Sequence, residues 1–312
     1  MYTYQRSHGK VLTQLNRMYN GEYIWNPWHG CRQCSIGCNH CFVFENDKLF
    51  GLNPENIHRS IGQFNLPTLT KRAKKKDIAT GRCDVQYLIP PGSTIIVCNS
   101  SDFFIEDADK WREQAWDIIS ERTDCLFIII TKRPENIEER LPNNWDSGYN
   151  NVALCVTAEN TDEAWNRIPI LLGIKAKHLG LWLEPLYEEV DIRPFLSSYI
   201  IENVVVGGET FQGLYEDARP LDINWVEKIR DACVEYDVSL NFIKTGSIFI
   251  GKNRTKSRVN RKSERALADF QRLNIEINNE TNWKLLPHML LNDKLVEEAF
   301  KLNTRLKNEI DY

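Results

Sequence analysis

Residues 152–184 read VALCVTAENTDEAWNRIPILLGIKAKHLGLWLE, and this stretch contains the unit from which the fold is built. An apolar, β-branched run at 152–157 precedes a helical pattern at 161–172, and a second apolar run follows at 179–184. Thr161 stands where the helix should begin, and its hydroxyl is suited to an N-cap. Two strands joined by a helix predict a βαβ unit with parallel strands.

The same alternation continues on both sides of this unit. Further strands are predicted at 94–99, 126–131, 203–208 and 239–244. Further helices are predicted at 109–122 and 223–236. Because crossovers between parallel strands are right-handed, the sheet should wind into a partial or complete parallel (β/α) barrel, an α/β fold of the TIM-barrel kind.

The two ends of the chain differ from this central part. We place the barrel at residues 1–250, with a structured loop dense in Trp, Gly, Pro and Cys at 25–44. Residues 252–265 hold seven Lys or Arg against one Glu, which predicts a flexible basic linker or a nucleic-acid contact. Residues 251–312 are therefore expected to form a basic linker followed by a small helical C-terminal segment.

Composition excludes several classes of protein. The chain has 312 residues, is 42% hydrophobic and 26% charged, and carries a formal net charge of −4. These values fit a globular protein and exclude one that coats nucleic acid with positive charge, although the basic runs at 71–76 and 252–265 leave room for a local contact. No apolar run is long enough for a membrane helix, and the N-terminus lacks the apolar core of a signal peptide, so we expect a cytoplasmic protein that makes no membrane contact.

Four of the nine cysteines fall within eleven residues, at Cys31, Cys34, Cys38 and Cys41. Such density in a cytosolic protein indicates metal chemistry more than disulfides. Zinc would use all four thiolates, but two C-x2-C pairs separated by only three residues would force one loop around a single ion. A redox C-x-x-C of the thioredoxin kind does not explain four clustered thiols. An iron–sulfur cluster remains, and Cys34-x3-Cys38-x2-Cys41 has the spacing of the radical S-adenosylmethionine (SAM) signature.

Longer motifs, spread from Trp25 to Lys244, carry a resemblance to a known family. They are Trp25-Asn26-Pro27 with Gly30-Cys31, Gly37-Cys38-Asn39-His40-Cys41-Phe42, Asn99-Ser100-Ser101-Asp102-Phe103-Phe104, Thr131-Lys132-Arg133-Pro134, Val156-Thr157-Ala158-Glu159, Glu184-Pro185-Leu186, Val206-Gly207-Gly208-Glu209 and Phe242-Ile243-Lys244. In these motifs the chain resembles the phage-associated three-cysteine-motif family, a radical SAM-like family of uncharacterised function. The family pattern C-x6-C-x2-C selects Cys31 as the first cluster ligand, whereas the superfamily spacing selects Cys34, and both alternatives stay open.

The resemblance implies a [4Fe–4S] cluster that cleaves SAM reductively to methionine and a 5′-deoxyadenosyl radical, which would act on an unknown substrate. Polar or glycine residues follow every predicted strand, at the end where barrel enzymes hold their ligands. Carboxylates suit the SAM ammonium, cations suit its carboxylate, and glycines permit close backbone approach. The residues expected to contact the cofactor or the substrate are Ser100, Asp102, Lys132, Thr157, Glu159, Glu184, Gly207, Gly208, Glu209 and Lys244.

A plainer interpretation of each of these residues is an ion pair across the barrel mouth or a helix cap. The expected partners are an unknown substrate, for which nucleic acid or a nucleotide is the first candidate, and an electron-donor protein. The alternative function is a non-catalytic protein that binds zinc or a structural cluster and acts with nucleic acid or a partner protein.

Overall fold

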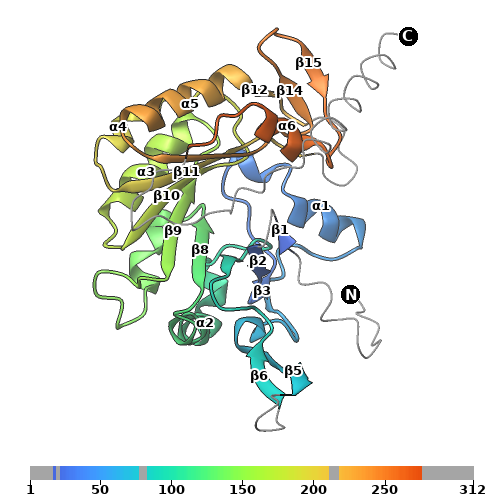
Figure 1. The fold of residues 1–312 in the computed structure, drawn as a ribbon, viewed down its shortest axis with the longest axis vertical. Helices are drawn as coiled ribbons and strands as arrows, with labels where there is room; N and C mark the ends of the chain where they lie inside the picture. Colours follow the sequence, from blue (N-terminus) through green and yellow to red (C-terminus); the bar gives the residue numbers. More distant parts are fainter. Residues whose placement is uncertain (1–16, 19–21, 77–82, 211–217, 276–312) are drawn as a thin grey trace.

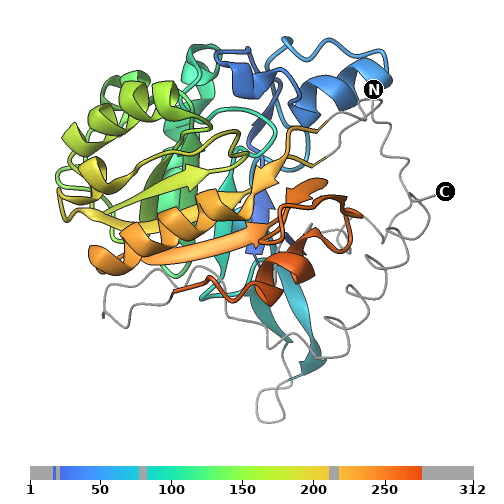
Figure 2. The ribbon, with the colours of Figure 1, turned by 90° about the horizontal axis from the view of Figure 1, so that it is seen from above.

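The structure is a computed structural model, which describes residues 17–18, 22–76, 83–210 and 218–275. Its centre is an eight-stranded sheet in the order β1-β2-β7-β8-β9-β10-β11-β13. β1 (Arg17–Met18) runs antiparallel to β2 (Glu22–Trp25), and the seven strands from β2 to β13 are parallel. The sheet curls into a half-barrel (Figure 2), which confirms the partial barrel.

The strand predictions hold within two residues at each end. The six strands are β7 (Thr94–Val97), β8 (Leu126–Thr131), β9 (Val152–Thr157), β10 (His178–Leu183), β11 (Ile201–Gly207) and β13 (Ser239–Lys244). The prediction missed β2, the first parallel strand, and placed its last residue, Trp25, in the structured loop at 25–44. Four residues are too few to show a period of two beside so many Trp, Gly and Pro, and β2 is recognised by its parallel pairing with β7.

The three predicted helices are present as α2 (Asp109–Glu121), α3 (Thr161–Gly173) and α5 (Ile223–Glu235). The N-cap prediction was wrong by one residue, because the side chain of Asn160 accepts the Glu163 N–H at 2.8 Å. Helices α1 (Phe42–Leu49) and α4 (Arg193–Leu196) were not predicted, whereas α6 (Glu264–Phe270) lies within the C-terminal segment that was expected to be helical. Figure 1 shows α3, α4 and α5 along one side of the sheet and α1 on the opposite side of the molecule.

Both faces of the parallel strands are buried, as expected for a sheet covered by helices. Alternate residues pack against the helices in the larger cluster, for example Ile129 and Leu154. The residues between them form a second cluster inside the half-barrel, which consists of Ile96, Ile128, Ala153, Cys155, Trp182, Val205 and Ile243. The strands are therefore rigid supports, and the residues that follow them are held in place by packing on both sides.

Short strands complete the fold. β3 (Trp28–His29) pairs with β4 (His58–Arg59), and β5 (Thr70–Lys76) pairs with β6 (Cys83–Tyr87) in a hairpin that projects at the bottom of Figure 1. The third small sheet contains β12 (Leu221–Asp222), β14 (Ile248–Ile250) and β15 (Lys256–Arg258). Within the described residues, no helix combines the length and the hydropathy needed to cross a lipid bilayer.

The segment 252–265 is folded, which corrects the prediction of a flexible linker. It contains β15 and the start of α6, and Val259 packs into the larger core cluster. Two of its basic side chains pair with acids: Lys252 Nζ lies 2.6 Å from Glu227, and Arg254 Nη1 lies 2.5 Å from Asp222. The predicted C-terminal helical segment beyond residue 275 lies outside the described residues.

Replacing Asn160 with alanine should destabilise the protein by about 1 kcal/mol, because it removes the side-chain acceptor of the Glu163 N–H in the first turn of α3. Urea unfolding of the purified variant measures this loss of free energy. Thr161→Ala is the matched control and should be close to neutral. A larger loss at Thr161 than at Asn160 would contradict the assigned cap.

Candidate functional site

The carboxyl ends of the parallel strands enclose a cavity of about 230 Å³. Its floor is apolar and includes Ile96, Ile130 and Trp182. Its upper wall contains residues from the cysteine loop and from the strand ends, namely Cys31, Cys38, Cys41, Asp102, Lys132, Arg133, Thr157, Glu184, Gly208, Glu209 and Lys244. Seven of the ten predicted contact residues thus line one cavity, while Ser100, Glu159 and Gly207 do not line it.

The cysteine loop, which consists of residues 26–41, leaves β2 and crosses the mouth of the half-barrel before α1 begins. Gly30 lies where the loop passes close to neighbouring backbone: its φ is +90°, and a Cβ there would lie 2.8 Å from the carbonyl oxygen of Asn56. The Gly30 N–H donates to the Ser100 carbonyl at 3.2 Å, and the Cys31 N–H donates to the Pro54 carbonyl at 2.9 Å. Ser100 therefore supports the loop through its backbone.

The four cysteines differ in exposure. Cys38 is buried, Cys31 and Cys41 are half-buried, and Cys34 is exposed. Cys31, Cys38 and Cys41 line the cavity, whereas Cys34 does not. Cys38 belongs to a 3-10 helix over Ile36–Cys38, and Cys41 is the residue before the first turn of α1. One loop of eleven residues thus directs three thiols to a single space.

The surroundings of the thiols shift their acidity. A hydrogen bond between Cys34 and Cys38, whose Sγ atoms lie 4.0 Å apart, is the main cause that lowers the pKa of Cys38 to about 5 and raises that of Cys34. Burial raises the pKa of Cys31 to about 12 and also raises the pKa of Cys41. The backbone N–H groups of Val43 and Phe44 oppose the effect of burial at Cys41.

Glu159, which follows β9, holds the cysteine loop from below. Its side chain is fully buried, and one oxygen accepts the Gly37 N–H at 3.2 Å and the Ser35 hydroxyl. The other oxygen pairs with Lys132 Nζ at 3.2 Å and with Arg167 Nη1 at 2.8 Å. Burial opposes ionisation, but the two cations and the hydrogen bonds lower the pKa of Glu159 to about 2.

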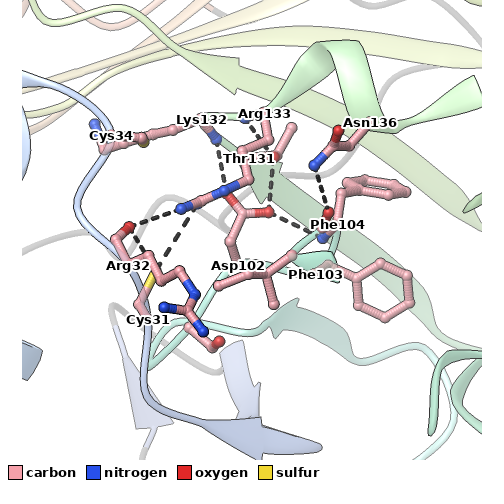
Figure 3. A network of polar contacts seen from close by, with 12 residues as sticks. Cys31, Arg32, Cys34, Asp102, Phe103, Phe104, Thr131, Lys132, Arg133 and Asn136 are labelled. Atoms are coloured by element: carbon pink, nitrogen blue, oxygen red, sulfur yellow. Dashed lines mark hydrogen bonds and ion pairs between the residues drawn. The ribbon is translucent and has the colours of Figure 1, made fainter. Parts of the chain in front are cut away.

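Asp102 joins the loops that follow β7 and β8 (Figure 3). Its Oδ1 accepts the Phe104 N–H at 2.9 Å and the Thr131 hydroxyl at 2.8 Å. Its Oδ2 accepts the Lys132 N–H at 3.0 Å and pairs with Arg133 Nη1 at 3.2 Å. All four donors belong to the protein itself, so Asp102 holds the two loops together. It also lines the cavity.

Glu184 and Lys244 form an ion pair across the strand between them. Glu184 Oε1 lies 2.5 Å from Lys244 Nζ, and Glu184 Oε2 accepts the Trp182 indole N–H at 2.7 Å. Gly207 of β11 lies beneath the pair, and a Cβ there would come within 3.0 Å of the Glu184 side chain. Both charged side chains are 15% exposed and line the cavity, whereas the Glu159 side chain is fully buried.

Glu209 lies at the centre of a network that the sequence did not reveal. Arg219 Nη2 lies 2.6 Å from Glu209 Oε1, the Tyr187 hydroxyl donates to the same oxygen at 3.1 Å, and His40 Nδ1 lies 3.2 Å from it. The Arg219 guanidinium also stacks 3.3 Å above the Tyr187 ring and donates to the Ile36 carbonyl at 3.4 Å. No sequence motif marks Arg219 or Tyr187, because their loops meet only in the folded protein.

Every predicted acid at the mouth therefore has a basic partner within the described residues, as the plainer interpretation expected. These pairs bring the predicted residues together without excluding a ligand, because a charged ligand can exchange with a pair. Trp28, in the first part of the cysteine loop, is fully buried and donates its indole N–H to the Asp102 carbonyl at 3.0 Å, which fits a packing role.

Among the described residues, no three His, Cys, Asp or Glu side chains converge closely enough to hold a single metal ion. The donor set does fit a polynuclear cluster, whose separate iron atoms each take one thiolate. Cys31, Cys38 and Cys41 would supply those thiolates from one loop, facing a shared cavity.

A family model described as a protein of unknown function, DUF5131, matches residues 17–272. No curated protein and no solved structure matches the chain.

Gly37→Ala should displace the cysteine loop, because the new Cβ would lie 2.1 Å from Glu159 Oε1. Glu159 is packed and charge-paired, so the loop has to move, and we expect the variant to unfold at lower temperature and to expose Cys38 to alkylating reagents. Gly173→Ala is the matched control, since nothing lies within 4 Å of its Cβ position. Equal thermal stability and equal Cys38 alkylation in the two variants would contradict this contact.

Glu159→Gln should destabilise the protein in a pH-dependent way. The pKa of Glu159 is lowered in the folded state, so the stabilisation is fully present above the unfolded-state value and is lost as the pH falls toward about 2. The difference from wild type should be on the order of 3 kcal/mol at pH 7 and should shrink from about pH 5 downward.

Urea unfolding at a series of pH values measures this difference. The control is Glu139→Gln, which alters a carboxylate that is 82% exposed and should change stability little at any pH. A wild-type to Glu159→Gln gap that stays constant from pH 7 to pH 3 would show that the carboxylate charge is not the stabilising feature.

Proposed function

Because the chain belongs to DUF5131, a family of unknown function, its activity has to be inferred from the site, and we propose that it is a radical SAM-type enzyme. The resemblance to the phage-associated three-cysteine-motif family is part of this proposal. The observation that carries it is the convergence of Cys31, Cys38 and Cys41 on one cavity at the carboxyl ends of seven parallel strands. This is the edge of a parallel sheet at which α/β proteins bind their ligands.

Three thiolates and four irons would leave one iron open for SAM. When bound, a [4Fe–4S] cluster supplies one electron that cleaves the sulfonium of SAM to methionine and a 5′-deoxyadenosyl radical, which takes a hydrogen atom from the substrate. The electron has to come from a separate donor, for which a small redox protein is the natural class. The protein itself binds, orients and shields these groups.

The charges around the cavity support a zwitterionic ligand. SAM carries an ammonium and a carboxylate on one carbon, and Glu184 and Lys244 present the complementary charges side by side. A zwitterion can replace their direct contact with two new ion pairs, so neither charge is left unpaired. The apolar floor beneath them, with Trp182, offers a surface for the adenine ring.

The substrate is proposed to be a nucleic acid or a nucleotide, on the basis of the basic segment at 252–265 and the basic run at 71–76. Two side chains of the first segment, Lys252 and Arg254, are more than half exposed in spite of their acidic partners, so their charge faces solvent. Residues 71 and 72 belong to the projecting hairpin, and both are exposed.

One observation favours the alternative function, a non-catalytic zinc protein. The Sγ atoms of Cys34 and Cys38 lie 4.0 Å apart, near the roughly 3.8 Å that separates two thiolates on one tetrahedral zinc. A zinc site would enlist Cys34, which the proposed cluster site leaves aside. Metal and sulfide content therefore separate the two functions.

Protein purified and reconstituted without oxygen should contain about four irons and about four sulfides per chain. The reduced protein should give an electron paramagnetic resonance signal that changes when SAM is added, because SAM would bind the open iron. Cys41→Ala should lose the cluster, since one of its three thiolates is missing. Cys125→Ala, which alters a buried cysteine distant from the loop in sequence, should retain it.

One zinc per chain without sulfide would overturn the radical SAM proposal and support the alternative. If the protein holds iron and sulfide but its electron paramagnetic resonance signal does not change when SAM is added, the cluster is structural and the catalytic part of the proposal is wrong.

A further inference from the structure

Arg133 occupies a constrained position between the cysteine loop and the strand ends (Figure 3). Its side chain is 8% exposed. Nη1 lies 3.9 Å from Cys31 Sγ and 3.2 Å from Asp102 Oδ2, and Nη2 donates to the Arg32 carbonyl at 2.7 Å. One guanidinium thus contacts a thiol, a carboxylate and the backbone of the loop at once.

The guanidinium cannot easily leave this position. Its partner Asp102 is fixed by three further donors, from Phe104, Thr131 and Lys132. Moving a buried cation away from its counter-charge also costs free energy, because the charge would then be buried without a partner. Arg133 is therefore a fixed positive group beside the sulfur of Cys31.

Cys31 is held more firmly than Cys34 in the same loop. Hydrogen bonds anchor both ends of the peptide group that precedes Cys31: the Ser101 hydroxyl donates to the Gly30 carbonyl at 2.5 Å, and the Cys31 N–H donates to the Pro54 carbonyl at 2.9 Å. Cys34 is exposed, and the contact that the structure records for its sulfur is Cys38 Sγ at 4.0 Å.

We propose that Arg133 is a positioning residue that selects Cys31, rather than Cys34, as the third cluster thiolate and that balances its negative charge. This inference rests on the proposed function, since it needs an iron–sulfur cluster in the cavity. It resolves the choice that the sequence spacing left open. It also assigns Arg133 a physical effect beyond holding the loop.

That effect is on the reduction potential. A hydrogen bond and a positive charge at a ligating sulfur withdraw electron density from the cluster, which makes the reduced form easier to reach. Replacing Arg133 by a neutral residue should therefore make the potential more negative. A residue that served only as a structural support would leave the potential unchanged as long as the cluster remained bound.

The experiment compares the reconstituted wild type with Arg133→Gln, Arg133→Lys and the control Arg32→Gln. The Arg32 guanidinium belongs to the same loop, but its recorded ion pair is with Asp107, at 2.7 Å, and not with a cysteine. Potentiometric titration followed by electron paramagnetic resonance measures the midpoint potential of each protein. Arg133→Gln should lower the equilibrium constant for one-electron reduction at least tenfold, about 59 mV, whereas Arg32→Gln should leave it unchanged.

Arg133→Lys keeps a cation next to Asp102, so it is the variant to measure if Arg133→Gln does not fold. A single ammonium cannot reach the carboxylate, the thiol and the Arg32 carbonyl together, so the potential should shift in the same direction by a smaller amount. A wild-type potential in Arg133→Lys, or equal shifts in Arg133→Gln and Arg32→Gln, would overturn the inference.

Ligand choice is tested with Cys31→Ala and Cys34→Ala. Cys34→Ala should retain about four irons and the wild-type potential, whereas Cys31→Ala should lose the cluster. The reverse result would overturn the inference while leaving the proposed function intact. A wild-type protein that holds no iron and no sulfide would overturn both.

Discussion

The buried carboxylate of Glu159 is the interaction on which the rest of the site depends. It lies at the end of β9, without solvent contact, between Lys132 from the neighbouring strand end and Arg167 from α3. The same carboxylate accepts the Gly37 N–H and so holds the cysteine loop. Breaking its ion pairs would leave a buried charge without a partner, which is strongly unfavourable. The absence of a Cβ at Gly37 is what lets the loop come this close.

Opposite charges repeat around the mouth of the half-barrel. Asp102 pairs with Arg133, Glu184 with Lys244, and Glu209 with Arg219. Such pairs position the loops accurately, because each loop end is bound to its neighbour and not to water. A charged ligand that contacts one member of a pair would compete with its partner, and a zwitterion would offer a counter-charge to each member.

The contrast between Arg133 and Arg219 shows two uses of the same side chain. Arg133 faces a thiol and lies within the wall of the cavity, whereas Arg219 stacks on Tyr187 and donates to the carbonyl of Ile36. Two guanidinium groups thus hold the cysteine loop at two points along its backbone, Arg32 and Ile36. Its conformation is set by residues far away in the sequence, as expected for a segment with few helical or strand hydrogen bonds of its own.

The sequence by itself determined the α/β class, six of the seven parallel strands and the edge of the sheet at which Asp102, Glu159, Glu184 and Lys244 would meet. It could do so because a period of two, a period of 3.6 and the shared carboxyl edge of parallel strands are local or topological properties. Only the tertiary structure decided that β2 joins the sheet, that Cys31 faces the cavity while Cys34 faces solvent, and that Arg133, Arg167 and Arg219 complete the site. Those features depend on contacts between segments up to 183 residues apart, and no local pattern records them.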